Sequence, residues 1–198
     1  MKKNQKEWEE VYSDDSIFHK NEFPSELVIQ FVRRNYTSKI APTSRGGVKA
    51  LDIGCGWGNN LKFVKNDGFD IYGIDFSESA IESLKKDFQS KVKVGDISKM
   101  PYEDQYFDFC FDKSAIQHNI KDDIFKIHNE VFRILKPNGK FFSTMLTEGN
   151  NGFITGFLNE KELKDSLKKF KEIKIDYITK TENNERDKFT AYIIEATK

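Results

Sequence analysis

Cysteine is scarce in this sequence, which contains only Cys55 and Cys110 among its 198 residues. Two cysteines so far apart fit neither a disulfide framework nor a zinc site, because both need closely paired cysteines. Such a chain suits a reducing compartment. We therefore expect a cytoplasmic protein without a bound metal.

Long apolar runs are also missing, and neither sign of charge is in excess. No stretch approaches the ~20 apolar residues that a membrane span requires, and the polar N-terminus lacks the pattern of a signal peptide. The 32 basic and 32 acidic residues cancel, so no overall field attracts nucleic acid or an anionic membrane surface. Neither a membrane nor nucleic acid is an expected partner.

Aromatic residues are plentiful: 18 Phe and 7 Tyr stand in a chain that is 32% charged. This composition predicts an aromatic core beneath a highly charged surface. A chain of this length can form one core without disulfides or metals. We expect a single domain over residues 1–198, with a helical cap or lid at 1–47 and the main core at 48–198, as a monomer or a homodimer.

From residue 48 onward, short apolar runs alternate with segments of helical periodicity, a pattern typical of βαβ units. Strands are predicted at residues 48–53, 69–75, 91–94, 106–111, 140–146, 172–178 and 188–197. Helices are predicted at residues 24–36, 59–67, 122–135 and 159–170, with a further one after the N-cap Ser77.

The sixth predicted strand alternates Ile173, Ile175 and Tyr177, which favours an edge or antiparallel strand over an interior parallel one. The last two strands are expected to form a hairpin around a polar surface loop at residues 180–187. The sequence therefore predicts an α/β fold, a Rossmann-like three-layer α/β/α sandwich. Its seven-stranded sheet is mixed because the last strand is antiparallel.

A glycine-rich turn lies between the first predicted strand and the next helix, with the glycines Gly54, Gly56 and Gly58. Glycines allow close approach of backbone to a ligand, and the following helix N-terminus offers free N–H groups. Asp52 lies two residues before the first glycine. A carboxylate there would repel a pyrophosphate but suits a ligand that carries an ammonium and a sulfonium.

Two further acids end the next two predicted strands. Asp75 follows the glycine turn by about 20 residues, the position at which a carboxylate can accept both ribose hydroxyls. Asp96 ends the following strand, where it can bind an adenine amino group while Ile97 packs on the ring. Three acids at three successive strand ends indicate a nucleoside site without a phosphate clamp.

Residues 50–145 resemble the core of the class I S-adenosylmethionine-dependent methyltransferases, in particular the small bacterial methyltransferase type 11 group. The resemblance rests on the D-x-G-x-G-x-G turn, on Asp75 and Asp96, and on the segments 107–113 and 135–140. It implies that S-adenosylmethionine is the cofactor and S-adenosylhomocysteine the product. The cofactor-binding residues that it implies are Asp52, Gly54, Cys55, Gly56, Gly58, Asn59, Asp75, Phe76, Ser77, Asp96, Ile97 and Lys113.

Two aromatic residues near the start, Trp8 and Tyr12, are four positions apart and share one face of a helix. They are either packing residues or part of a lid, and related small methyltransferases have a similar pair, which favours contact with the cofactor. His19 is a weak candidate for the acceptor site. The glycine-containing segment 146–158 is expected to shape that site.

Gln117 and His118 follow the fourth predicted strand, at the rim where parallel sheets bind ligands. An imidazole can remove a proton from the acceptor, and a histidine bonded to nearby backbone is the alternative. Gln117 is the better candidate for contact with the methionine part of the cofactor. These two residues are the catalytic candidates.

We expect an enzyme that methylates an oxygen or nitrogen of a small metabolite or sugar intermediate. Asp112-Lys113-Ser114-Ala115 differs from the Asn/Asp-Pro-Pro-aromatic motif of base-methylating enzymes, which disfavours DNA amine methylation. Alternatives are a non-catalytic S-adenosylmethionine-binding regulatory domain and, less favoured, a protein or RNA methyltransferase. A nicotinamide-dependent oxidoreductase is opposed by Asp52 and by the glycine spacing.

Overall fold

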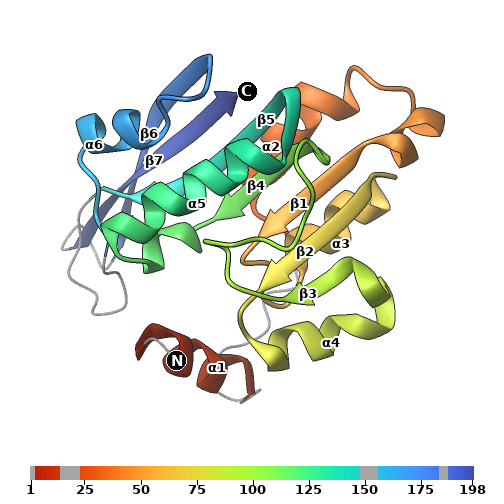
Figure 1. Cartoon of the computed structure of the whole chain (residues 1–198), viewed down its shortest axis with the longest axis horizontal. Helices are drawn as coiled ribbons and strands as arrows, with labels where there is room; N and C mark the ends of the chain where they lie inside the picture. The colour runs from red at the N-terminus through yellow and green to blue at the C-terminus, as the bar shows by residue number, and fades with distance from the viewer. Residues whose placement is uncertain (1–2, 14–22, 148–155, 183–186) are drawn as a thin grey trace. The chain divides into compact units, whose positions relative to one another are not determined.

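The computed structural model describes residues 3–13, 23–147, 156–182 and 187–198 of the chain (Figure 1). The strands are β1 (Lys49–Ile53), β2 (Asp70–Asp75), β3 (Val92–Val94), β4 (Phe107–Lys113), β5 (Leu135–Leu146), β6 (Glu172–Glu182) and β7 (Asp187–Thr197). The α-helices are α1 (Lys3–Ser13), α2 (Glu26–Val32), α3 (Asn59–Asn66), α4 (Glu78–Phe88), α5 (Lys121–Ile134) and α6 (Glu160–Ser166). Shorter helical turns are η1 (Arg33–Thr37), η2 (Pro42–Gly47), η3 (Gln89–Lys91) and η4 (Ile116–His118).

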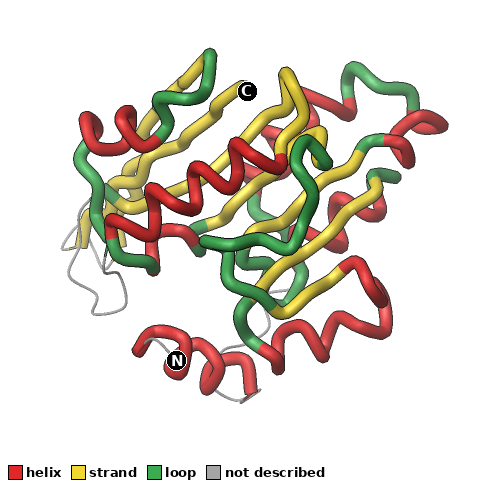
Figure 2. Tube along the Cα trace, in the orientation of Figure 1, coloured by secondary structure: helices red, strands yellow, loops and turns green. Residues whose placement is uncertain are grey.

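The strands form a seven-stranded sheet in the order β3-β2-β1-β4-β5-β7-β6. Strand β7 is antiparallel to both of its neighbours, whereas the pairs β1–β2, β2–β3 and β4–β5 are parallel, so the predicted mixed sheet is confirmed. Helices and strands alternate from β1 to β3 and again from β4 to β6 (Figure 2). The chain divides into two compact units, a first unit of Met1–Pro101 and a second unit of Tyr102–Lys198. The single domain with a cap at residues 1–47 stays a prediction.

In the first unit, β1, β2 and β3 are parallel and pair in register, with Asp52 opposite Gly73 and Asp75 opposite Val94. Helices α3 and α4 pack on β2, and α1 packs on α4. The residues of β1 are buried on both faces, as expected for an interior parallel strand, whereas the edge strand β3 leaves Val94 exposed. The fully buried side chains here include Leu51, Ile53, Leu61, Ile71, Ile74 and Ile81.

In the second unit, β4 and β5 are parallel, and β7 lies between β5 and β6. The core of this unit is aromatic, as the composition predicts, and its largest buried side chains are Phe107, Phe109, Phe111, Phe141 and Phe142. Helix α5 packs on β5 and on α6. Its predicted apolar stripe is buried, at Ile124, Ile127, Val131 and Ile134.

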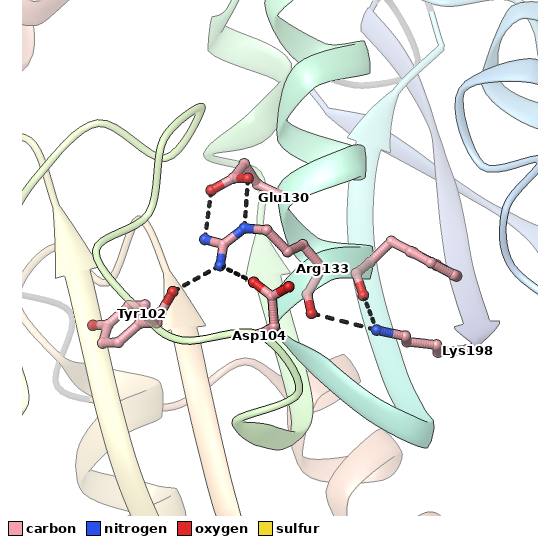
Figure 3. Close-up of polar contacts among 6 residues, drawn as sticks. Tyr102, Asp104, Glu130, Arg133 and Lys198 are labelled. Atoms are coloured by element: carbon pink, nitrogen blue, oxygen red, sulfur yellow. Dashed lines mark hydrogen bonds and ion pairs between the residues drawn. The ribbon is translucent and has the colours of Figure 1, made fainter.

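The C-terminal end of α5 is held by charged side chains of the same unit (Figure 3). Lys198 Nζ donates hydrogen bonds to the backbone oxygens of Phe132 at 2.6 Å and Arg133 at 3.3 Å. The Arg133 guanidinium binds both carboxylate oxygens of Glu130, and it reaches Asp104 and the backbone oxygen of Tyr102. A lysine at this position satisfies carbonyls that lack helical partners and complements the helix dipole.

Three local predictions about capping or backbone conformation are confirmed, although Asn138 lies within β5 and not at a helix end. Ser77 is the N-cap of α4, and its hydroxyl accepts a hydrogen bond from the N–H of Ala80 at 3.0 Å. Gly68 ends α3 with a φ of 95°. Asn138 has a φ of 64°, the left-handed conformation that asparagine tolerates best among residues with a side chain.

The N-terminal segment differs from its prediction in two places. The helix predicted at residues 24–36 starts after the N-cap Ser25 and changes at Arg33 from an α-helix into the π-helical turn η1. The linker predicted at residues 43–47 is instead the 3-10 helix η2, which has a proline in its first turn. Proline presets the backbone angle for a helical first turn, so a short helix forms despite the two glycines.

The C-terminal elements also differ in length. The helix predicted at residues 159–170 ends at Ser166, and β5 begins at Leu135 rather than at residue 140. Strand β6 extends to Glu182 and β7 begins at Asp187, so half of the loop predicted at residues 180–187 is strand. Residues 183–186 lie outside the described part. Pairing between the two strands extends them into polar residues, beyond the apolar alternation from which the strands were predicted.

Candidate functional site

The glycine turn between β1 and α3 requires glycine at its three predicted positions. Gly54, Gly56 and Gly58 have φ values of 68°, 48° and 77°, in the left-handed region that other residues rarely adopt. The N–H groups of Gly54 and Cys55 both donate to the carbonyl oxygen of Ile74 on β2, at 2.8 and 3.1 Å. The turn is therefore fixed to the neighbouring strand by backbone hydrogen bonds.

Asp75, at the end of β2, also holds the glycine turn. One of its carboxylate oxygens accepts the Gly56 N–H at 2.9 Å, and the other accepts the Ser77 N–H at 3.0 Å. Burial raises the pKa of Asp75 above its ordinary value, although these hydrogen bonds oppose the rise. Each carboxylate oxygen can accept two hydrogen bonds, so Asp75 can bind a further donor such as a ribose hydroxyl.

Asp52 adds a second buried carboxylate to the first unit, and its side chain is 1% exposed in β1. Asp52 and Asp75 both disfavour ionisation of the neighbouring Cys55 and Tyr12, whose pKa values are raised chiefly by burial. An electrostatic field that opposes new negative charge favours a cation. The turn is thus suited to a positively charged ligand.

The predicted adenine-side residues follow β3. Asp96 is exposed, and one of its oxygens accepts hydrogen bonds from the N–H and the hydroxyl of Ser98, at 2.8 and 2.7 Å. Gly95 donates its N–H to the backbone oxygen of Asp75 at 2.8 Å, so this turn adjoins the end of β2. Phe76 and Ile97 directly follow Asp75 and Asp96 in the sequence, and both are half-buried.

Helix α1 brings its aromatic residues to the glycine turn. Tyr12 stacks on Trp8 with ring centroids 5.9 Å apart, and it meets Trp57 of the turn edge-on at 5.2 Å. A Cβ atom placed on Gly56 would lie 2.6 Å from the Tyr12 hydroxyl oxygen. The structure therefore brings Trp8 and Tyr12 together with the glycine turn.

In the second unit, the predicted catalytic residues lie on η4, directly after β4. The carbonyl oxygen of the Gln117 side chain accepts the N–H of Leu146 at 2.8 Å, and Gln117 is buried. His118 is half-buried and donates its backbone N–H to Ala115. Lys113 is exposed and donates to the Ser114 hydroxyl at 3.0 Å. His19 and most of the segment 146–158 lie outside the described residues.

The η4 turn is organised by a residue that the sequence analysis did not select, Asp112. This carboxylate is fully buried and accepts hydrogen bonds from the N–H groups of Ala115 at 2.7 Å and Ile116 at 3.2 Å. The Ser143 hydroxyl donates to its other oxygen at 2.6 Å. Burial raises the pKa of Asp112 to about 6 despite these bonds. Asp112 precedes η4 by four residues, and an aspartate shortly before a turn is a capping signal that could have identified it.

The sequence analysis also passed over Glu9. Its carboxylate accepts hydrogen bonds from the N–H and the hydroxyl of Ser79, at 3.2 and 2.5 Å, at the start of α4. Nothing in the local sequence of α1 indicates this contact, because it depends on how α1 packs on α4.

Several side chains that could serve other chemistry are structural here. Cys55 and Cys110 are buried, and burial raises the pKa of both thiols, which makes them poor nucleophiles. His128 is fully buried on α5, where burial lowers its pKa to about 3. Among residues 3–13, 23–147, 156–182 and 187–198, no group of three or more His, Cys, Asp or Glu side chains could hold a metal ion. In the same ranges, no helix has the length and apolar character for a membrane crossing.

Comparison with known proteins finds a family profile that matches the middle of the chain. A family profile described as a methyltransferase domain matches residues 51–143. Phosphoethanolamine N-methyltransferase 2 of Caenorhabditis elegans is 34% identical over 110 residues, which are 52% of this chain and 25% of that protein. This chain therefore aligns with only a quarter of that relative.

Solved structures are similar in fold. A SAM-dependent methyltransferase from Archaeoglobus fulgidus has a TM-score of 0.69 at 19% identity, over 87% of this chain and 94% of that chain. A phosphoethanolamine N-methyltransferase 2 from Haemonchus contortus, solved with phosphomonomethylethanolamine and S-adenosylhomocysteine, has a TM-score of 0.62 at 21% identity. The match covers 82% of this chain and 52% of that one. These likenesses confirm the Rossmann-like fold, and the profile match shows that residues 51–143 resemble a methyltransferase domain.

Proposed function

We propose that this protein transfers the methyl group of S-adenosylmethionine to an oxygen or nitrogen of a small molecule. The observation that carries the proposal is the pair of buried carboxylates, Asp52 and Asp75, on adjacent strands around a left-handed glycine turn. Such a site repels pyrophosphate and favours a ligand with an ammonium and a sulfonium. Asp52 opposes the pyrophosphate of a nicotinamide dinucleotide, whereas an acid at the position of Asp75 is common to the binding sites of both cofactors.

In the proposed complex, different residues bind different parts of the cofactor. Asp52 and the turn Gly54–Gly58 would hold the methionine part, and Asp75 would accept the ribose hydroxyls. Asp96 would bind the adenine amino group between Phe76 and Ile97. Asn59, Ser77 and Lys113 complete the proposed set, with Trp8 and Tyr12 supplied by α1.

When bound, S-adenosylmethionine supplies an electrophilic methyl group for in-line displacement. The protein then needs to hold the acceptor in line and to exclude water, and orientation alone can supply much of the rate. His118 would take the acceptor proton at an imidazole nitrogen as the acceptor atom attacks. Gln117 would help to orient the reactants from the same turn.

A small acceptor is supported by two observations. The neutral overall charge provides no field for a nucleic acid. Two of the three proteins named above are phosphoethanolamine N-methyltransferases, and the substrate in their name is a small molecule. A non-catalytic domain that only binds the cofactor is the competing function, and it differs in predicting binding without turnover.

The test begins with calorimetric titration of S-adenosylmethionine, S-adenosylhomocysteine and NADH. We expect the two sulfur ligands to bind with micromolar dissociation constants and NADH not to bind. Asp52→Asn should abolish binding, whereas Glu82→Gln, at an exposed position on α4, should leave it unchanged. Absence of binding by well-folded wild-type protein would overturn the proposal.

Turnover is tested by screening pools of small alcohols and amines for release of S-adenosylhomocysteine. His118→Ala should lower the rate by about a hundredfold, the usual contribution of a general base, without changing the cofactor dissociation constant. Cofactor binding with no release across the pools would favour the non-catalytic function.

A further inference from the structure

Glu9 occupies the N-terminus of α4, an 11-residue helix. Its Oε1 accepts two hydrogen bonds from Ser79, from the backbone N–H at 3.2 Å and from the hydroxyl at 2.5 Å. The first N–H groups of a helix have no partners within the helix and carry its positive dipole end. A carboxylate from another helix therefore binds there through charge as well as through hydrogen bonds.

The ionisation of Glu9 is consistent with this contact. Partial burial opposes its negative charge, but hydrogen bonds from the hydroxyls of Ser77 and Ser79 and from the N–H groups of Ser79 and Glu78 outweigh burial. The pKa of Glu9 is consequently lower than its ordinary value. Glu9 is thus a charged group at neutral pH, held by the first turn of α4.

Glu9 and Tyr12 are three residues apart and lie on neighbouring parts of one face of α1. The Glu9 contact on α4 therefore fixes the position of Tyr12, whose hydroxyl lies over Gly56 and whose ring meets Trp57. A helix of 11 residues has little stability of its own in water, so its order depends on such contacts.

We infer that Glu9 is a positioning residue for cofactor binding, which fastens α1 to the N-terminus of α4 and holds Tyr12 against the cofactor turn at Gly56. The inference rests on the proposed function, because it concerns the same S-adenosylmethionine site. Glu9 acts through Tyr12 and does not itself touch the cofactor.

In the proposed complex, α1 covers the cofactor and adds an aromatic group to its site. Aromatic faces attract cations, and Trp8, Tyr12 and Trp57 form a continuous aromatic group beside a turn with two buried carboxylates. A cationic sulfonium ligand gains from both features. Loss of the Glu9 contact should therefore release the cofactor faster.

The test compares Glu9→Gln with the matched control Glu10→Gln. Glu10 is exposed on the same helix and pairs only loosely with Lys6, at 3.9 Å. We expect Glu9→Gln to raise the dissociation rate and the dissociation constant of S-adenosylmethionine about tenfold, as loss of a charge-assisted hydrogen bond does. Glu10→Gln should match the wild type. The rates come from stopped-flow displacement and the constants from calorimetry.

A second readout reports the docking of α1 itself. The chain has two tryptophans, Trp8 and Trp57, and both contact Tyr12. In Glu9→Gln their fluorescence should shift to the red, while the unfolding midpoint of the protein changes little. Ser79→Ala should reproduce both effects, and the double variant Glu9→Gln/Ser79→Ala should add little to either single change.

Unchanged cofactor kinetics and fluorescence in Glu9→Gln and Ser79→Ala would overturn the inference, as would tighter binding in either variant. Failure of the proposed function is distinguishable, because the wild type itself would then not bind S-adenosylmethionine. In that case the fluorescence shift still shows whether Glu9 docks α1, and the role in cofactor binding is rejected.

Discussion

The carboxylate of Asp75 accepts a hydrogen bond from the Gly56 N–H at 2.9 Å, across 19 positions of sequence. The acid at the end of β2 therefore shapes the turn that follows β1. The same glycine is covered on its other side by Tyr12. Gly56 is consequently the residue at which the backbone of the turn, the acid of the next strand and the first helix meet.

Gly56→Ala adds a single methyl group but should weaken cofactor binding strongly. Alanine in the left-handed conformation is destabilised by about 1–2 kcal/mol, and its Cβ would displace the Tyr12 hydroxyl. We expect the dissociation constant of S-adenosylmethionine to rise about tenfold or more, measured by calorimetry, with a loss of about 1–2 kcal/mol in urea unfolding.

Gly47→Ala is the matched control. No atom lies within 4 Å of a Cβ placed on Gly47, so this variant should bind the cofactor normally. Its stability should equal that of the wild type or exceed it by up to about 1 kcal/mol, because alanine lowers the conformational entropy of the unfolded chain. Equal cofactor affinity in the two alanine variants would contradict the role given to Gly56.

Much of the fold could be predicted because buried parallel strands are short apolar runs that stand out in a charged chain. The strand at β2 and the helix after Ser77 were located within a residue or two for this reason. The glycine turn was equally clear, since its three left-handed residues are glycines. Local sequence determines these features.

Other features depend on tertiary contacts and have no local pattern. The Glu9 contact requires α1 to pack on α4, and an exposed-looking glutamate in a polar helix does not reveal it. The extension of β6 to Glu182 depends on pairing with β7 and not on apolar alternation. In the sequence, Asp112 stands out only because the residues after it differ from the base-methylation motif. Its structural role, the buried hydrogen bonds of its carboxylate, depends on tertiary contacts.

Lys198→Met should lower the stability of the protein by about 1 kcal/mol. The ammonium holds two carbonyls at the end of α5 and lies 4.6 Å from the centroid of the Phe132 ring. Burial lowers the pKa of Lys198, which shows that desolvation offsets part of this gain. Urea unfolding at pH 7 measures the change. Lys168→Met, at an exposed ion pair, should alter stability by less than about 0.5 kcal/mol.

His128 should make the protein less stable as the pH falls below about 6.5. The Ser166 hydroxyl donates to the Leu163 carbonyl at 2.7 Å, so its oxygen accepts the His128 Nδ1–H at 2.8 Å. Nε2 has no hydrogen-bond partner among the described residues, and burial lowers the pKa to about 3. The unfolded chain then binds more protons between pH 6.5 and 3, which favours unfolding.

The expected loss from this residue is about 2 kcal/mol between pH 7 and pH 5. His128→Phe removes the titrating group while it preserves an aromatic ring beside Phe141. The pH dependence of its urea unfolding should be flatter than that of the wild type by this amount. Parallel stability curves for the two proteins would show that His128 is not responsible.

Asp112→Asn should stabilise the protein at neutral pH more than at acid pH. The folded-state pKa of about 6 exceeds the ordinary value of 3.8, so the folded chain binds more protons between these values. Stability from this group is therefore present below about pH 4 and is lost as the pH rises through 6. The asparagine amide can accept from Ala115 and Ile116 and donate to Ser143, but it carries no charge to bury.

Relative to the wild type, Asp112→Asn should gain about 2 kcal/mol in urea unfolding between pH 4.5 and pH 7.5. Asp112→Ala should lose stability at both pH values, because the N–H groups of η4 then lack their acceptor. If the stability difference between Asp112→Asn and the wild type is the same at both pH values, burial does not raise the pKa of the Asp112 carboxyl. The turn that carries Gln117 and His118 would in that case be held by an ordinary ionised aspartate.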